Sequence, residues 1–271
     1  MKGLLNTEWL KLRKYPAFWW MTGIIALSYP GVNYIFYHIY QQVISKGDNT
    51  AQMVKMLVGN PFSFPEVWHT VAYASSLFIF IPSVVVIMFI TNEYTYKTHR
   101  QNIIDGWSRK QFITSKFIDV LLLTALVTVL YLLVALVLGL INNGESTTTI
   151  WSGSKYIGLF ALQAFSQLSI AFLIAFLVRK AFVSLGIFIF YFIILEPVIV
   201  GIAKVKGNDL GRFMPLEISD RLIPVPAFLA RLGETSYKAA LAAINPHIIY
   251  TLVMTTLVWV ICFRINSRRD L

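Results

Sequence analysis

Long stretches without a single charged residue are the feature of this 271-residue chain that most constrains its fold. One runs from Tyr156 to Val178 and another from Ala181 to Leu195, and both consist mainly of apolar residues. A helix needs about 20 consecutive, predominantly apolar residues to cross the hydrocarbon core of a bilayer. Stretches of this length and composition therefore predict helices that lie in lipid.

Six stretches of this kind predict an all-α polytopic membrane protein with six transmembrane helices. Pro30-Gly31 in the first stretch predicts a kink, and Pro82 in the second is tolerated if neighbouring groups satisfy the freed carbonyl. We expect residues 1–271 to form a single transmembrane domain. The expected spans are about 17–40, 69–92, 113–141, 155–178, 181–203 and 246–264.

The charge balance narrows the classes of partner. The chain carries 23 Lys and Arg against 13 Asp and Glu, a net charge of +10, which is typical of proteins that bind nucleic acid or a membrane surface. Hydrophobic residues make up 57% of the chain and charged residues only 13%, against about 25% charged residues in a typical soluble domain. We therefore expect membrane lipid, and no nucleic acid, as a partner.

The positions of the charges predict the orientation in the membrane. With six spans, both termini lie on one side, together with residues 93–119 and the Arg179-Lys180 turn. This side holds fourteen basic and five acidic residues, a net of +9, while the other side holds nine and eight, a net of +1. Because positive charge accumulates on the cytoplasmic side, both termini are expected in the cytoplasm.

The N-terminal segment, residues 1–16, places apolar residues near one helical face and basic residues around the remainder. This pattern is typical of an interfacial helix on anionic lipid, and a basic flank that only sets topology explains it equally well. A cleaved signal peptide is disfavoured, because the apolar run that follows exceeds about twenty residues and offers no small-x-small cleavage site.

The segment between the second and third spans carries two helix-start signals. Thr98 with Gln101, and Ser108 with Gln111, have the spacing of a capping box, in which side chains satisfy the first N–H groups of a helix. An Asp-Gly pair between them is a helix-stop signal. The segment therefore predicts a short helix, a turn at Gly106 and a second helix that runs into the third span.

Three apolar residues, Ile103, Ile104 and Trp107, lie on or beside this short helix among basic residues. Apolar side chains presented beside positive charge in a cytoplasmic loop indicate a docking site for another protein. The alternative is an amphipathic loop that rests on the lipid headgroups.

The same segment also carries a recognisable motif. From Glu93 to Arg109 it has the form Glu-x-x-x-x-(Thr/Ser)-x-Arg-x-x-(Ile/Leu)-x-x-Gly-x-Ser-Arg, and Lys116 then opens the third span. With the amphipathic N-terminal segment and the six-span layout, it resembles the permease subunit of the ABC-2 class of ABC transporters. In that family the motif brackets a short coupling helix that docks in a cleft of the ATPase subunit.

The resemblance implies the permease of an ATP-driven exporter in the bacterial cytoplasmic membrane, which partners ABC ATPase subunits and a second permease copy. It implies no cofactor in this chain, since the partner subunit binds ATP and the sequence has no Gly-x-x-x-x-Gly-Lys-Ser/Thr loop. The apolar, aromatic-rich spans suit a hydrophobic or amphipathic substrate. The residues implied in ATPase docking are Glu93, Thr98, Arg100, Ile103, Ile104, Gly106, Trp107, Ser108 and Arg109.

The connection between the fifth and sixth spans, about Lys204–Asn245, mixes apolar residues with charges, Gly and Pro. It predicts extracellular or re-entrant helices, which in the family it resembles cap the translocation path. Glu196, Phe213 and Phe228 are therefore candidates for this path or its outer gate. An intramembrane acid is costly and hence a functional candidate, but Pro197 is expected to break the helix beside Glu196, so a hydrated helix end is the alternative.

Two other classes of function stay open: an intramembrane lipid-modifying enzyme, and a carrier or scaffold that works without an ATPase. No catalytic residue or metal site is predicted, because the histidines are scattered and the His-Glu-x-x-His and Gly-x-Ser-x-Gly motifs are missing. A cluster of intramembrane carboxylates, which a proton-coupled carrier needs, is not expected either.

Overall fold

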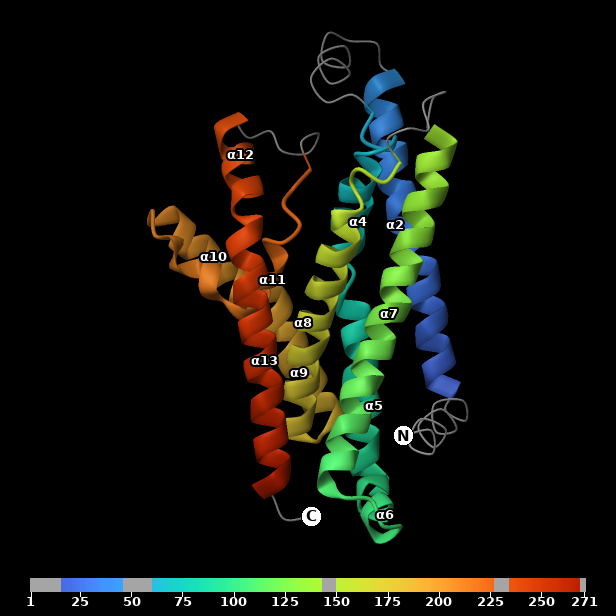
Figure 1. Cartoon of the computed structure of the whole chain (residues 1–271), viewed down its shortest axis with the longest axis vertical. Coiled ribbons are helices and arrows are strands. Elements are labelled where there is room, and N and C mark those ends of the chain that lie inside the picture. The colour runs from blue at the N-terminus through green and yellow to red at the C-terminus, as the bar shows by residue number, and fades with distance from the viewer. Residues whose placement is uncertain (1–15, 46–59, 143–149, 227–233, 269–271) are drawn as a thin grey trace.

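The computed structural model describes residues 16–45, 60–142, 150–226 and 234–268 (Figure 1). Within these ranges all regular secondary structure is helical, which confirms the all-α class. The predicted interfacial helix lies outside the described residues, apart from Pro16, which begins the first helix.

The chain runs through eleven α-helices, one π-helix and one 3₁₀ helix within the described ranges. In chain order they are α2 (Pro16–Ser45), α4 (Val67–Ser76), α5 (Phe80–Thr95), α6 (Thr98–Ile104), α7 (Arg109–Asn142), α8 (Lys155–Val178), α9 (Ala181–Phe190), the π-helix η1 (Tyr191–Leu195), α10 (Glu196–Val205), the 3₁₀ helix η2 (Asp209–Phe213), α11 (Pro215–Asp220), α12 (Glu234–Ala242) and α13 (Ile244–Arg268).

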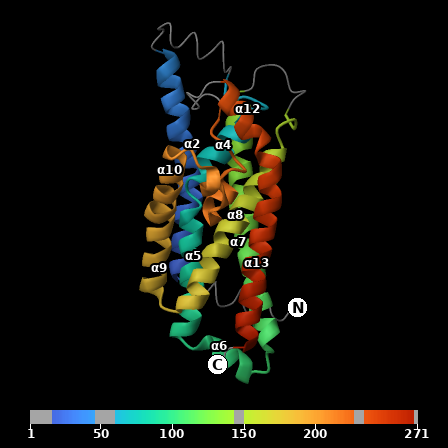
Figure 2. The ribbon, with the colours of Figure 1, turned by 90° about the vertical axis from the view of Figure 1, so that its left-hand side faces the viewer.

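The long helices form an elongated bundle with α8 at its centre (Figures 1 and 2). α8 contacts α4, α5, α7 and α13. Its polar residues Gln163, Gln167 and Ser169 are all buried, because lipid offers such groups no hydrogen-bond partner. Ser169 Oγ accepts a hydrogen bond from the indole N–H of Trp259 on α13 at 2.9 Å. These side chains fix α8 as the inner helix of the bundle.

Four helical segments of the described chain are long and apolar enough to cross a membrane: α7, α8, the continuous run α9–η1–α10, and α13. The bent pair α4 and α5 makes a fifth if it is counted as one span. α2 has 30 residues but does not reach the same hydropathy. Its Trp, Tyr, Pro and Asn residues account for the difference.

A bend of 46° separates α4 from α5, where a single helix was expected. Pro82 lies in the first turn of α5 and has no N–H to donate to the carbonyl of Phe78. The N–H of Ile81 bonds that carbonyl instead, at 3.1 Å. The Phe78 carbonyl is therefore hydrogen-bonded, as expected, but the helix is interrupted between α4 and α5.

The prediction that Pro197 breaks its helix is wrong. The helix runs on from Ala181 to Val205 through the π-helical turn η1, in which the N–H of Glu196 bonds the carbonyl of Tyr191. A π-turn is wider than an α-turn, and we attribute the tolerance of the proline ring to this extra room. Glu196 consequently lies within a long helix rather than at its end.

The start of α2, the end of α13 and the short helix α6 lie at one end of the bundle, which we call the α6 end (Figures 1 and 2). α12 lies at the opposite end, the α12 end. The segments η2 and α11 fold back beside α10 and α13 in the half nearer the α12 end. The two ends of the bundle hold the two candidate sites.

Candidate functional site

The α6 end carries a helix-turn-helix built from residues 93–112. α6 is seven residues long and ends at Ile104, and the turn that follows contains Gly106, whose φ of +96° is a conformation that glycine adopts easily. The N–H of Ser108 donates to Gln111 Oε1 at 2.8 Å, and the N–H of Gln111 donates to Ser108 Oγ at 3.2 Å. The second predicted capping box is thus confirmed, and so is the turn.

The first predicted capping box, Thr98 with Gln101, is wrong. Lys97 precedes α6 in a left-handed conformation with φ of +54°, and no side chain caps the helix. The turn directs the Thr98 hydroxyl back to the carbonyl of Glu93 at 3.4 Å, while the Gln101 amide donates to Asp105 at 3.0 Å. The sequence spacing was right, but the path of the backbone before the helix pointed the hydroxyl elsewhere.

A buried ion pair anchors this hairpin to the bundle. Lys116 Nζ on α7 lies 2.7 Å from Glu93 Oε1 on α5 and 3.4 Å from Asp119 Oδ2, and it sits 4.3 Å from the centre of the Phe89 ring. Buried charges persist only when they are paired and hydrogen-bonded. The Glu93 carbonyl also accepts a hydrogen bond from His99 Nδ1 at 3.1 Å. Glu93 therefore joins α5, α6 and α7.

The predicted docking residues fall into two groups. Glu93 is buried, and Thr98 is half-buried against the end of α5, so both support α6 from beneath. Ile104 is 77% exposed, Arg100 and Ser108 are exposed, and Ile103 and Trp107 are half-buried. An apolar side chain flanked by a cation is thus presented at the tip of the hairpin.

Arg109, also predicted as a docking residue, faces α13 instead. Its guanidinium donates to the carbonyl of Ser267 at 3.2 Å, and its own carbonyl accepts from Asn266 Nδ2 at 2.7 Å. These two hydrogen bonds, which we call the α13 staple, tie the start of α7 to the end of the last helix. The partners are more than 150 positions apart, and no sequence pattern indicated the contact.

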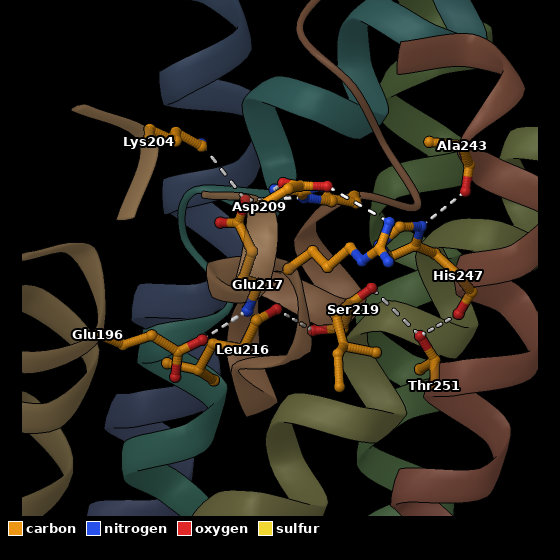
Figure 3. Close-up of polar contacts among 12 residues, drawn as sticks. Glu196, Lys204, Asp209, Leu216, Glu217, Ser219, Ala243, His247 and Thr251 are labelled. Carbon is orange, nitrogen blue, oxygen red and sulfur yellow. Dashed lines mark hydrogen bonds and ion pairs between the residues drawn. The ribbon is translucent and has the colours of Figure 1, made fainter. Parts of the chain in front are cut away.

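A cavity of about 820 Å³ lies in the other half of the molecule, between α4, α8, α10, α11 and α12. Among the described residues, four carboxylates line it: Glu196, Asp209, Glu217 and Asp220. η2 and α11 fold back and carry three of these acids to the cavity that Glu196 lines. These three acids lie outside the candidate membrane spans, so the expectation of no intramembrane carboxylate cluster stays a prediction. Figure 3 shows Glu196 reaching α11, where its Oε1 accepts the N–H of Glu217 at 2.6 Å.

Two cations neutralise part of the cluster. Arg221 contacts Asp209 and Glu217, each at 2.9 Å, and Lys204 lies 3.4 Å from Glu217. Hydrogen bonds from Arg221 hold the pKa of Asp209 below its usual range. Asp209 and Glu217 are therefore the two cavity acids that form ion pairs with these cations.

The predicted gate residues differ in how close they lie to the cavity. Glu196 is buried, which argues against the hydrated helix end considered for it. Phe213, on η2, is half exposed and packs on Tyr250 at 5.6 Å between ring centres. Phe228 lies outside the described residues. The sequence missed Gln163 and Gln167, whose amides reach the cavity acid Asp220, because uncharged residues in a span carried no signal.

Comparison with known families decides the class of protein. The family described as "ABC-2 family transporter protein" matches residues 4–195, well over half of the chain. The chain belongs to this family. Its membership, together with the apolar helices, makes it a multi-pass membrane protein and a permease component of an ABC exporter, a transporter subunit rather than an enzyme.

The family match covers the α6 end of the molecule and the cavity residues on α4, α8 and η1, such as Tyr73, Gln163 and Phe192, but none of the four cavity carboxylates. It includes α6 and the ion pair at Glu93, and it ends at Leu195, one residue before Glu196. Permeases of the ABC-2 family work together with ABC ATPase subunits, so this permease has ABC ATPase subunits as partners. A search among curated proteins found no match to this permease.

Proposed function

We propose that this permease is the membrane-spanning half of an ATP-driven ABC-2 exporter and that α6 is the helix on which its ATPase docks. In this proposal the chain forms one domain with six spans, of which α2 is the first. The domain lies in the bacterial cytoplasmic membrane, with both termini in the cytoplasm. The shared end of α2, α6 and α13 supports an even number of spans. The net charge of +9 assigned to that side supports its cytoplasmic location.

The observation that carries the proposal is the exposed tip of a rigidly held α6. Ile104 is open to solvent, beside Arg100, while the Glu93–Lys116 pair holds the base of the hairpin. A docked ATPase that moves on ATP binding pushes on a rigid hairpin rather than on a flexible loop. Such a contact converts the movement of the ATPase into a shift of α5 and α7.

A continuous set of contacts leads from α6 to the cavity. The α13 staple joins α7 to the end of α13, and the hydroxyl of Thr251 on α13 donates to the carbonyl of Ile218 on α11 at 3.4 Å. α11 in turn carries Glu217 and Asp220 at the cavity wall. Within the proposal, this route lets a shift at the docking helix alter the outer half of the molecule.

We further propose that two permease copies assemble around a two-fold axis. Six spans enclose little room for a translocation path, and the α9–η1–α10 run is the least buried of the candidate spans. A path shared between two copies suits a hydrophobic or amphipathic substrate. Membrane lipid covers the remaining apolar surface.

Replacing Ile104 with aspartate tests the docking helix. Co-expressed with its ABC ATPase, the wild-type permease should co-purify with that subunit, and Ile104→Asp should lower the recovered ATPase at least tenfold, because an apolar anchor becomes a charge in the interface. Leu210→Asp is the matched control, since Leu210 is also an exposed aliphatic residue, at 65%, but lies on η2, away from the α6 end. ATPase recovery that Ile104→Asp leaves unchanged would refute α6 as the docking helix.

A further inference from the structure

The acidic cavity has the size and lining of a small-molecule site. Its volume of about 820 Å³ lies within the range of about 300–1,000 Å³ that such sites occupy. Apolar residues from several helices make up much of its wall: Leu77, Phe192, Pro197, Val200 and Ile223. The polar groups gather where α8, α10 and α11 meet, so the cavity has an apolar part and a charged part.

Two of the four cavity carboxylates have no cation within ion-pair distance among the described residues. The donors that contact Glu196 are neutral: the backbone N–H groups of Glu217 and Leu216 and the hydroxyl of Tyr191. Asp220 Oδ1 accepts from the amides of Gln163 at 2.8 Å and Gln167 at 2.6 Å. Since Lys204 and Arg221 contact Asp209 and Glu217, the charged part of the cavity is left with excess negative charge.

A buried amide oxygen gives an independent indication of a ligand. Gln163 is 2% exposed and lines the cavity, and its Oε1 has no hydrogen-bond partner among the described residues. A buried acceptor left without a donor destabilises the fold, because it has given up its hydrogen bonds to water without replacing them. Its Nε2 is bonded to Asp220, so the unsatisfied oxygen lies next to a carboxylate that lacks a cation. Acceptors therefore outnumber donors at this point.

We propose that the cavity binds the protonated amine of an amphipathic cation, with Glu196, Asp220 and Gln163 as its acceptors. An alkylammonium group has three N–H donors and no acceptor, which complements two carboxylates and an amide oxygen. The apolar wall takes the hydrocarbon part of the ligand. This inference rests on the proposed export function, because the bound cation is then the substrate that the permease exports.

The proposal predicts a pH dependence with a definite sign. Burial, with the nearby charges of Glu217 and Glu196, raises the pKa of the Asp220 carboxyl to about 7. The share of Asp220 that carries a negative charge therefore increases as the pH rises through about 7. The groups that face it are Gln163 and Gln167 on α8, Glu217 on α11, Glu196 on α10 and Tyr73 on α4. Binding of an amine that stays protonated should tighten as the pH rises from 6 to 8.

Binding of a fluorescent amine to the full chain in lipid nanodiscs tests the site without any ATPase. The probe is monodansylcadaverine, and its N-acetyl derivative keeps the dansyl group and the alkyl chain but lacks the positive charge. The amine should bind at least tenfold more tightly than the acetyl derivative, because charge-assisted hydrogen bonds are about twice as strong as neutral ones. Equal binding of the two probes would overturn the proposal on the unmodified chain.

Amide variants locate the site. Glu196→Gln and Asp220→Asn should each weaken amine binding about tenfold and leave binding of the acetyl derivative unchanged, and Asp220→Asn should abolish the tightening between pH 6 and 8. Asp105→Asn, at the α6 end, is the control and should bind like wild type. Unchanged amine affinity in both cavity variants would place the ligand elsewhere.

The same measurement separates this inference from the docking proposal. Ile104→Asp should retain amine binding while it loses the ATPase. If the amine fails to bind a permease that still recruits its ATPase, the cavity inference is wrong and the docking proposal stands. If the amine binds but the wild-type permease recruits no ATPase, the docking proposal is wrong and the cavity inference stands.

Discussion

Replacing Lys116 with methionine should lower the free energy of unfolding by about 3–5 kcal/mol, because it leaves the Glu93 carboxylate buried without its cation. Methionine has a similar length, so lost charge rather than lost volume causes the effect. Thermal unfolding in detergent, followed by tryptophan fluorescence, should show a midpoint about 10 °C lower. Since Glu93 also holds α6 through its carbonyl, ATPase co-purification should fall as well.

The double variant Glu93→Leu with Lys116→Met is the control for this prediction. A buried ion pair replaced by apolar residues of similar volume is often neutral for stability, so the double variant should be more stable than Lys116→Met alone. Asp119 limits the recovery, because its carboxylate lies 3.4 Å from the lysine ammonium and loses that contact. A double variant as unstable as the single one would show that the charge pair is not the anchor.

Replacing Trp259 with alanine should have an effect of similar size, a loss of about 3–5 kcal/mol. The indole lies at the junction of three helices, where its ring centre is 4.7 Å from that of Phe117 on α7 and 4.8 Å from that of Phe172 on α8. Helices in lipid associate through such packing rather than through the hydrophobic effect. Trp259 also lies on α13 between Thr251 and Asn266, so substrate-stimulated ATP hydrolysis should decline with stability.

Trp259→Phe separates ring packing from the hydrogen bond. It keeps an aromatic ring but removes the N–H that donates to Ser169 Oγ. The Ser169 hydroxyl still donates to the carbonyl of Phe165 at 2.6 Å, so the loss should be only about 1 kcal/mol. Equal losses in the alanine and phenylalanine variants, measured by the same unfolding assay, would mean that the hydrogen bond dominates.

Local sequence signals were reliable where the interaction itself is local. Ser108 and Gln111 form their capping box because both partners lie within one helical turn, and Gly106 makes the turn after α6 because its own backbone conformation suffices. Thr98 and Gln101 have the same spacing but do not pair, since the left-handed turn at Lys97 changes the direction from which the chain enters α6.

The helix around Pro197 shows a second limit of local reasoning. Proline usually interrupts a helix because it lacks an N–H and its ring meets the preceding turn. Here a π-turn comes directly before it and the helix continues to Val205. The sequence of this segment contained the proline but no sign of the altered turn, so Glu196 was placed at a hydrated helix end instead of in a buried position.

The sequence by itself determined the helical class, the membrane environment and the turn between α6 and α7, since hydropathy, charge and helix signals act over a few neighbouring residues. Only the tertiary structure decided which distant groups meet. The ion pair of Glu93 with Lys116, the α13 staple, and the meeting of Glu196, Asp220 and Gln163 each join residues from different helices. Such contacts depend on how the helices pack and on how η2 and α11 fold back, and no single segment of the chain specifies either.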